Sequence, residues 1–205
     1  GFDPDQLEGV LQHLVGCPWA RLTGLHAHIG SQIFELQPHR DLAGVLADAL
    51  ALEWPDLAVL VGVAEPMGAT DRPNLFNAIA LIGAGQWRIV ARKRLLPTYD
   101  VFDEDRYFEP ANAPTVITHA GRRIGVTICE DIWTEETCET LAETGAEILL
   151  VPNGSPFERN KDDVRLNLVV ARVTETGLPM AYLNQVGGQD ELVFDGTSMV
   201  FTAEG

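Results

Sequence analysis

The chain has 205 residues, a length that corresponds to one large domain or two small ones. Its 46% hydrophobic content is enough for a buried core. Thirty acidic residues against fourteen basic ones give a formal net charge of −16, which argues against nucleic acid and anionic membranes as partners. Only two of the basic residues are lysines, Lys93 and Lys161.

No apolar run is long enough for a transmembrane helix, and the first residues have neither the basic region nor the apolar run of a signal peptide. Three cysteines, Cys17, Cys129 and Cys138, favour a reducing compartment over a disulfide framework, so we expect a cytoplasmic protein. The cysteines and histidines do not have the spacing of a zinc site, and we predict no metal.

Apolar periodicity predicts an alternation of helices and strands along the chain. In the first half the predicted elements are helices over 3–15 and 38–52 and strands over 21–29, 57–63, 76–82 and 87–91. The last two strands flank Gly83-Ala84-Gly85, which is typical of a hairpin turn. Residues 97–114 contain three prolines and several aromatic side chains, which favour a long ordered loop with a functional role.

The second half continues the alternation. Its predicted elements are strands over 115–118, 124–128, 148–152 and 180–184 and helices over 135–144 and 162–176. The turns that separate elements include Ala120-Gly121 and Asp195-Gly196, the second of which lies between two short strands. This order of elements is typical of an α/β layered domain.

The strongest chemical signal lies at Cys129, which follows the predicted strand 124–128 and precedes two acids, Glu130 and Asp131. A helix is predicted to start near Thr134. Strand ends that precede helices are common positions for reactive groups, because the next backbone N–H can face a developing oxyanion. A buried structural cysteine is the alternative, but two adjacent carboxylates favour a nucleophile.

A nucleophilic cysteine needs a base and a nearby cation. His119 is the only histidine in this half of the chain, and the hairpin that follows it carries it away from the end of the Cys129 strand. A carboxylate with Lys93 remains, since an amine can donate, accept and shift its pKa whereas a guanidinium cannot. The alternative for Lys93 is a solvated surface charge between two arginines.

Four motifs then resemble one known family. Lys93-x-x-Leu96-Pro97 with the stretch 99–108 resembles the second motif of the nitrilase, or carbon–nitrogen hydrolase, superfamily, and 128–133 resembles its cysteine motif. Residues 153–165 look like the segment that follows it. Residues 184–196 resemble the glutaminase domain of glutamine-dependent NAD+ synthetases, and the likeness extends from about residue 53 to residue 205.

The resemblance implies an αββα sandwich, here truncated at its N-terminal strand or strands, in which a cysteine attacks the side-chain amide of glutamine and releases ammonia through a thioester. Carried over by position, Cys129 is the nucleophile, Lys93 stabilises the oxyanion, and Glu104 is a second acid close to the site. The positions that match the glutamine pocket are Tyr99, Phe102, Glu130, Ser155 and Lys161. The alternatives for these are core aromatics, a turn residue and a surface charge.

The family's general base is a glutamate in a segment of the type Phe-Pro-Glu-Leu-x-x-Thr-Gly-Tyr, and nothing of that form precedes Lys93. We predict Glu104 as the carboxylate within reach of Cys129. Loss of a general base typically costs on the order of 10²–10⁴ in rate, so we expect acylation with slow turnover.

Residues 1–50 resemble a different family. Gly24-Leu-His26-Ala-His28-Ile-Gly-Ser31-Gln is similar to a motif of diaminopimelate decarboxylase, a pyridoxal-phosphate barrel in which the second His stacks on the cofactor and the Ser meets its phosphate. The first fifty residues contain no lysine for a Schiff base and only one predicted strand. We therefore predict a chimera, with segment 1–50 joined to an incomplete glutaminase domain over 51–205, and no bound pyridoxal phosphate.

No Ser-Gly-Gly-x-Asp-Ser nucleotide loop occurs in the chain, so ATP and Mg²⁺ are expected to belong to a synthetase domain that is absent from it, and we predict no cofactor here. The expected partners are glutamine, that synthetase domain and further copies of the chain in a homo-oligomer. Two alternatives to an amide hydrolase remain: a catalytically dead scaffold, and a decarboxylase fragment.

Overall fold

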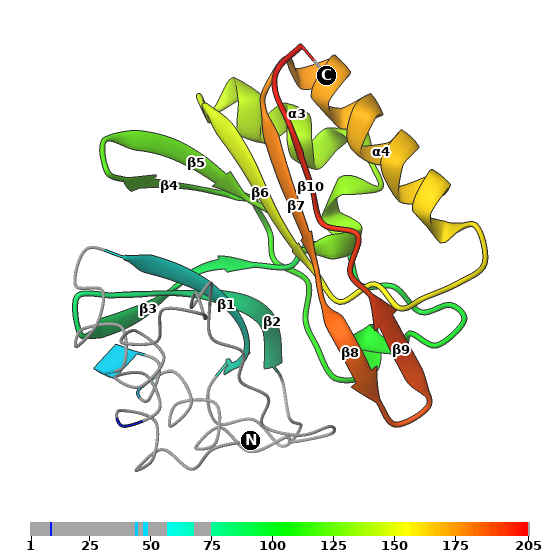
Figure 1. Ribbon diagram of the computed structural model, residues 1–205. Coiled ribbons are helices and arrows are strands. Elements are labelled where there is room, and N and C mark those ends of the chain that lie inside the picture. Colours follow the sequence, from blue (N-terminus) through cyan, green and yellow to red (C-terminus); the bar gives the residue numbers. More distant parts are fainter. Residues whose placement is uncertain (1–8, 10–43, 45–46, 49–56, 68–74, 205) are drawn as a thin grey trace. The chain divides into compact units, whose positions relative to one another are not determined.

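Figure 1 shows the protein as a computed structural model, which describes residues 9, 44, 47–48, 57–67 and 75–204. Apart from residues 9, 44 and 47–48, the elements predicted before residue 57 lie outside the described residues, as do the decarboxylase-like motif and Cys17. The chain forms two compact units, residues 1–61 with 80–88 and residues 62–79 with 89–205. Every site residue discussed below belongs to the second unit.

Three strands form one sheet in the order β1-β2-β3, and their bounds are Ala58–Pro66, Leu75–Gly83 and Gln86–Arg92. The hairpin predicted between the second and third strands is confirmed. Ala84 and Gly85 both have positive φ, at 51° and 70°, as a two-residue type I′ turn requires.

A second sheet has five strands in the order β10-β7-β6-β5-β4 (Figure 1). The strands are β4 (Thr115–His119), β5 (Arg122–Val126), β6 (Ile148–Asn153), β7 (Met180–Asn184) and β10 (Met199–Phe201). The three central strands are parallel and the two outer ones antiparallel to their neighbours. Strands β8 (Val186–Gln189) and β9 (Leu192–Asp195) form a separate hairpin, of which β8 was not predicted.

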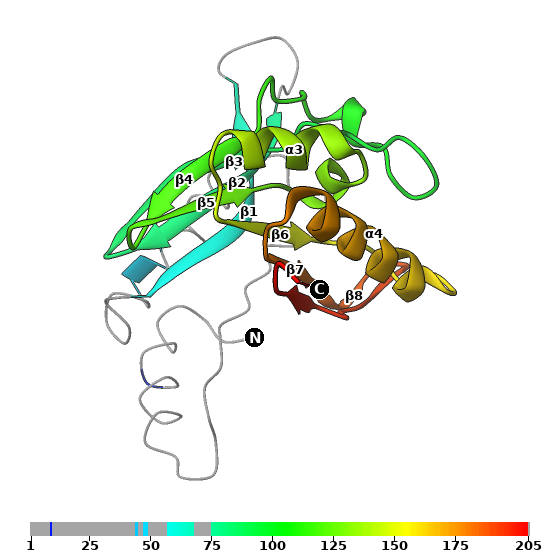
Figure 2. The same ribbon diagram turned by 90° about the horizontal axis from the view of Figure 1, so that it is seen from above.

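Helices α3 (Glu135–Glu143) and α4 (Lys161–Thr176) lie on the same face of the five-stranded sheet, as Figures 1 and 2 show. Apolar side chains of both helices pack with those of β6 and β7 in one core cluster, whose fully buried members include Leu141, Leu149, Val151, Val169 and Met180. Both helices were predicted within one residue at each end. Gly177 ends α4 with φ 64° and donates its N–H to Val173, a common C-terminal cap.

The loop between β3 and β4 is ordered by backbone hydrogen bonds, as its aromatic content predicted. It contains a short 3₁₀ helix, η1 (Glu104–Arg106), whose first N–H donates to Pro97. Further along, the N–H of Ala111 donates to the carbonyl of Lys93 at 2.9 Å. Within the described part of the chain, no helix has the length and apolar character needed to cross a membrane.

Candidate active site

Cys129 lies three residues beyond the end of a strand rather than directly after it. The prediction of a strand over 124–128 is wrong at its end, because β5 stops at Val126 and a 3₁₀ helix, η2 (Cys129–Ile132), begins at the cysteine. The side chain of Asp131 accepts the N–H of Ile128 at 3.0 Å, which replaces a sheet hydrogen bond with a local one. Cys129 itself has φ 47°, in the left-handed region that non-glycine residues rarely adopt.

The electrostatic surroundings of the Cys129 thiol identify its charged neighbours. Burial raises the pKa of this thiol to about 11, while the positive charge of Lys93 acts to lower it. Three carboxylates act to raise it further: Glu104, Glu130 and Asp131. The thiol is therefore protonated at neutral pH. Among the described residues, no hydrogen bond joins its sulfur to a carboxylate.

Lys93 and Glu104, both predicted as site residues, form an ion pair. Lys93 Nζ donates to Glu104 Oε1 at 2.6 Å, and the lysine is only 1% exposed. This burial rules out the alternative of a solvated surface charge. Asn77 on β2 donates to the other carboxylate oxygen of Glu104 at 3.3 Å, and its carbonyl accepts the N–H of Lys93 at 2.8 Å.

Tyr99, Phe102 and Glu130 form a second group of predicted residues. The two rings meet edge to face, with centroids 5.7 Å apart, and Tyr99 donates its hydroxyl to Glu130 Oε1 at 2.7 Å. Burial and the hydrogen bond to this carboxylate both raise the pKa of Tyr99. Tyr99 is 42% exposed and is therefore not a core residue, while Phe102 is half-buried.

Lys161, at the first position of α4, faces the aromatic ring that follows η2. Its Nζ lies 5.7 Å from the centroid of the Trp133 ring, within the range of a cation–π contact. It also forms an ion pair with Glu158 at 3.2 Å, and its side chain is mostly buried. Lys161 is therefore held against Trp133, which follows Cys129 by four residues in the sequence.

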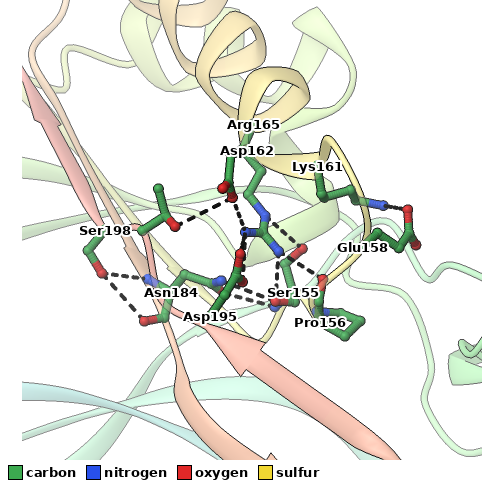
Figure 3. A network of polar contacts seen from close by, with 10 residues as sticks. Ser155, Pro156, Glu158, Lys161, Asp162, Arg165, Asn184, Asp195 and Ser198 are labelled. Atoms are coloured by element: carbon green, nitrogen blue, oxygen red, sulfur yellow. Dashed lines mark hydrogen bonds and ion pairs between the residues drawn. The ribbon is translucent and has the colours of Figure 1, made fainter.

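Ser155 is buried in a separate network, which Figure 3 shows, where hydrogen bonds join it to Asn184 and Arg165. Its N–H donates to Asn184 Oδ1 at 2.9 Å, and its carbonyl accepts from the Asn184 amide at 3.1 Å. Its hydroxyl oxygen accepts from Arg165 Nε at 3.2 Å. The hydroxyl hydrogen remains able to donate to a ligand.

Arg165 lies at the centre of this network and is fully buried. Its Nη1 contacts both carboxylate oxygens of Asp195, at 2.9 and 3.0 Å, and its Nη2 donates to the carbonyls of Ser155 and Pro156 (Figure 3). Burial acts to raise the pKa of Asp195, but the hydrogen bond from Arg165 holds it below its ordinary value. The guanidinium thereby joins α4, β9 and the loop that carries Ser155.

Replacing this guanidinium is expected to lower the free energy of unfolding. Loss of one partner of a buried ion pair typically costs about 3–5 kcal/mol, so Arg165→Met should show a loss of this size in urea unfolding. Arg106→Met is the matched control, since Arg106 pairs with Asp103 on the surface and such pairs contribute about 0–1 kcal/mol. Equal losses for the two variants would contradict the central role of Arg165.

Sequence reasoning missed several of these residues. Asp131 was noted only as an acid beside the cysteine, although its position three residues after Ile128 is the spacing at which a side chain reaches back to a helix N-terminus. Asn77 lies in none of the motifs, and Asn184 begins the motif 184–196 without a predicted role, because the partners of both residues are distant in sequence. The prediction for His119 is confirmed: it pairs with Arg122 at one end of the β4–β5 hairpin, whereas Cys129 follows the other end.

Two further features lie apart from this chemistry. An open cavity of about 330 Å³ is lined by β2, β3 and residues 110–113 and 115, and it includes no predicted site residue. Among the residues that the structure describes, no group of three or more His, Cys, Asp and Glu side chains is placed to hold a metal ion.

Comparison with known proteins gives the family. The model of the carbon-nitrogen hydrolase family matches residues 44–205. The chain belongs to this family. Curated relatives of this carbon–nitrogen hydrolase chain include glutamine-dependent NAD(+) synthetases from Rhodobacter capsulatus, 41% identical over 94% of the chain, and from Xanthomonas campestris pv. campestris, 47% identical over 64% of it. The chain spans 34% and 24% of the lengths of these two relatives.

Solved structures agree with this family assignment. The carbon–nitrogen hydrolase chain superposes on a glutamine-dependent NAD+ synthetase from Acinetobacter baumannii with a TM-score of 0.67 and 34% identity, over 82% of this chain and 33% of that one. It also superposes on an amidase of the nitrilase superfamily from Nesterenkonia with a TM-score of 0.70 and 24% identity, over 84% of this chain and 63% of that one. The predicted nitrilase-like α/β fold is confirmed.

Proposed function

We propose that this carbon–nitrogen hydrolase domain hydrolyses the side-chain amide of glutamine with Cys129 as its nucleophile, and passes the ammonia to an NAD+ synthetase partner. The observation that carries the proposal is the buried Lys93–Glu104 ion pair, whose lysine charge acts on the Cys129 thiol. Support also comes from the relatives named as glutamine-dependent NAD(+) synthetases, and from a variant of the Nesterenkonia amidase that shows covalent addition of an acetamide moiety at its active site cysteine.

In the proposed reaction Cys129 Sγ attacks the amide carbon of glutamine and a C–S bond forms. The carbonyl oxygen becomes an oxyanion, which the Lys93 ammonium and the backbone N–H of Glu130 stabilise. The thiol proton passes to the amide nitrogen, the C–N bond breaks and ammonia leaves. Water then attacks the thioester, so that glutamate is released and the Cys129 thiol is restored.

Proton transfer requires a base, because a thiol with a pKa of about 11 is ionised in only about one molecule in ten thousand at pH 7. We assign this role to Glu104, whose carboxylate accepts from Lys93 and whose charge acts on the Cys129 thiol. Glu130 and Asp131 are poorer candidates. The first already accepts the hydroxyl of Tyr99, and the second accepts three backbone N–H groups.

The charged groups around the cysteine suit an amino-acid substrate. Glutamine carries an ammonium and a carboxylate at one end, and Glu130 and Lys161 offer charges of the opposite sign. Tyr99 and Phe102 supply an apolar wall for the methylene groups between these charges and the amide. We assign Ser155 to the same pocket, as a hydroxyl donor on a loop that Arg165 and Asn184 fix.

Stoichiometric hydrolysis tests the proposed function. The purified chain is incubated with an equal concentration of glutamine, and glutamate and ammonia are measured over time, with asparagine as the shorter amide. We expect the two products to appear in equal amounts from glutamine and much more slowly from asparagine. No release from glutamine above the uncatalysed background by the folded chain would reject the function and favour a scaffold.

A further inference from the structure

A single buried carboxylate connects the two parts of the chain that carry Lys93 and Cys129. Asp131 is 2% exposed. Its Oδ1 accepts the backbone N–H groups of Arg94 at 2.9 Å and Leu95 at 2.8 Å, and its Oδ2 accepts the N–H of Ile128 at 3.0 Å. Hydrogen bonds to an ionised acceptor are about twice as strong as neutral ones, so this side chain is a strong anchor.

The three donors lie next to the two groups that the proposed reaction brings together. Arg94 and Leu95 directly follow Lys93, and Ile128 directly precedes Cys129. The two segments lie 37 positions apart in sequence at Arg94 and Asp131. The hydrogen bonds of Asp131 bind backbone N–H groups in both segments. They therefore fix the backbone positions from which the side chains of Lys93 and Cys129 extend.

The backbone of Cys129 gives independent evidence that this anchor matters. A φ of 47° at a non-glycine residue persists only when its surroundings hold it there. Asp131 makes two hydrogen bonds to Ile128, the residue that precedes Cys129: its carboxylate accepts the N–H of Ile128, and its own N–H donates to the carbonyl of Ile128 at 3.1 Å. Asp131 thus closes the turn that runs from Ile128 through Cys129.

We propose that Asp131 is a positioning residue: it holds the Lys93 ammonium beside the Cys129 thiol by binding the backbone of both segments. This inference rests on the proposed function. Asp131 does not touch the substrate and does not take the thiol proton, because three of the roughly four lone-pair positions of its carboxylate are occupied. Its effect on the thiol passes through Lys93.

Alkylation of Cys129 distinguishes positioning from a simple charge effect, because the two act in opposite directions. The charged groups around the thiol are Lys93, Glu104, Glu130 and Asp131, of which only the lysine favours the thiolate. In Asp131→Asn, loss of the negative charge alone would favour the thiolate and speed alkylation by neutral iodoacetamide. Displacement of Lys93 would slow it, by about tenfold for each pKa unit.

The experiment measures iodoacetamide alkylation at about pH 8, with the modified peptide identified by mass spectrometry. We expect Asp131→Asn to alkylate about tenfold more slowly than wild type. In glutamine hydrolysis, kcat should fall on the order of 10²–10³-fold with a smaller change in KM. Glu130→Gln is the matched control for charge, since it removes the adjacent carboxylate without touching the backbone anchor, and it should alkylate faster.

Asp131→Glu is the second variant, because it keeps the charge and moves the carboxylate by one methylene group. It should alkylate more slowly than wild type, with native thermal unfolding. Alkylation of Asp131→Asn at or above the wild-type rate would overturn the proposal. Failure of both variants to fold would also overturn it, because Asp131 would then have a structural role only. The alkylation results stand even if the wild-type chain hydrolyses no glutamine, so failure of the proposed function is recognised separately.

Discussion

The Cys129→Ala variant is expected to release no glutamate from glutamine above the uncatalysed background. Removing the nucleophile eliminates the thioester, and the remaining groups, including the Lys93–Glu104 pair, have no covalent intermediate to stabilise. In enzymes whose nucleophile and base act as a unit, such a loss is on the order of 10⁶-fold in kcat. The measurement is the rate of glutamate and ammonia release at saturating glutamine.

Cys138→Ala is the matched control for this experiment. Cys138 is fully buried in the core cluster between α3 and the five-stranded sheet, and burial raises the pKa of its thiol to about 12. Its truncation should lower the unfolding temperature while leaving kcat close to the wild-type value. Residual hydrolysis in Cys129→Ala, or equal losses in both variants, would show that another group attacks the amide.

The second large effect is expected for Lys93→Met, which keeps the length of the side chain and removes its charge. Loss of an oxyanion-stabilising donor typically costs on the order of 10²–10³-fold in kcat. The same substitution removes the charge that lowers the pKa of the Cys129 thiol. Alkylation of Cys129 at a fixed pH should therefore slow in parallel with glutamine hydrolysis.

Arg92→Met provides the comparison, since it removes the adjacent positive charge. Arg92 is exposed and pairs with Glu65, whereas Lys93 is buried and its charge acts on the Cys129 thiol. We expect this variant to retain wild-type hydrolysis and alkylation rates. If Lys93→Met hydrolyses glutamine as fast as Arg92→Met, the lysine has no part in the reaction.

Local patterns explain how much of the fold the sequence predicts. The helices at 135–143 and 161–176 follow from apolar periodicity and their end signals, of which Gly177 in the left-handed conformation is the clearest. The hairpin turn at Ala84-Gly85 follows from its glycines. The end of β5 could not be predicted in the same way, because the carboxylate that ends it also binds N–H groups 36 and 37 positions away.

The residues of the site also differ in whether local sequence patterns predict them. Cys129 and Lys93 are recognisable from their residue types and the motifs around them, and their neighbours Glu104 and Glu130 follow from those motifs. Arg165 and Asp131 lie within the same motifs, but their residue types predict no role, and only their burial and long-range partners show which backbone groups they hold. The residues to which we assign the chemistry are therefore easier to find in the sequence than the residues that hold the backbone around them.

The most direct test of the account is covalent labelling of the folded wild-type chain by a glutamine-mimicking electrophile, followed by peptide mass spectrometry. The account predicts one adduct per chain, at Cys129, which forms more slowly when glutamine is present and is absent in Cys129→Ala. Equal labelling of Cys17 and Cys138 with none at Cys129 would contradict it.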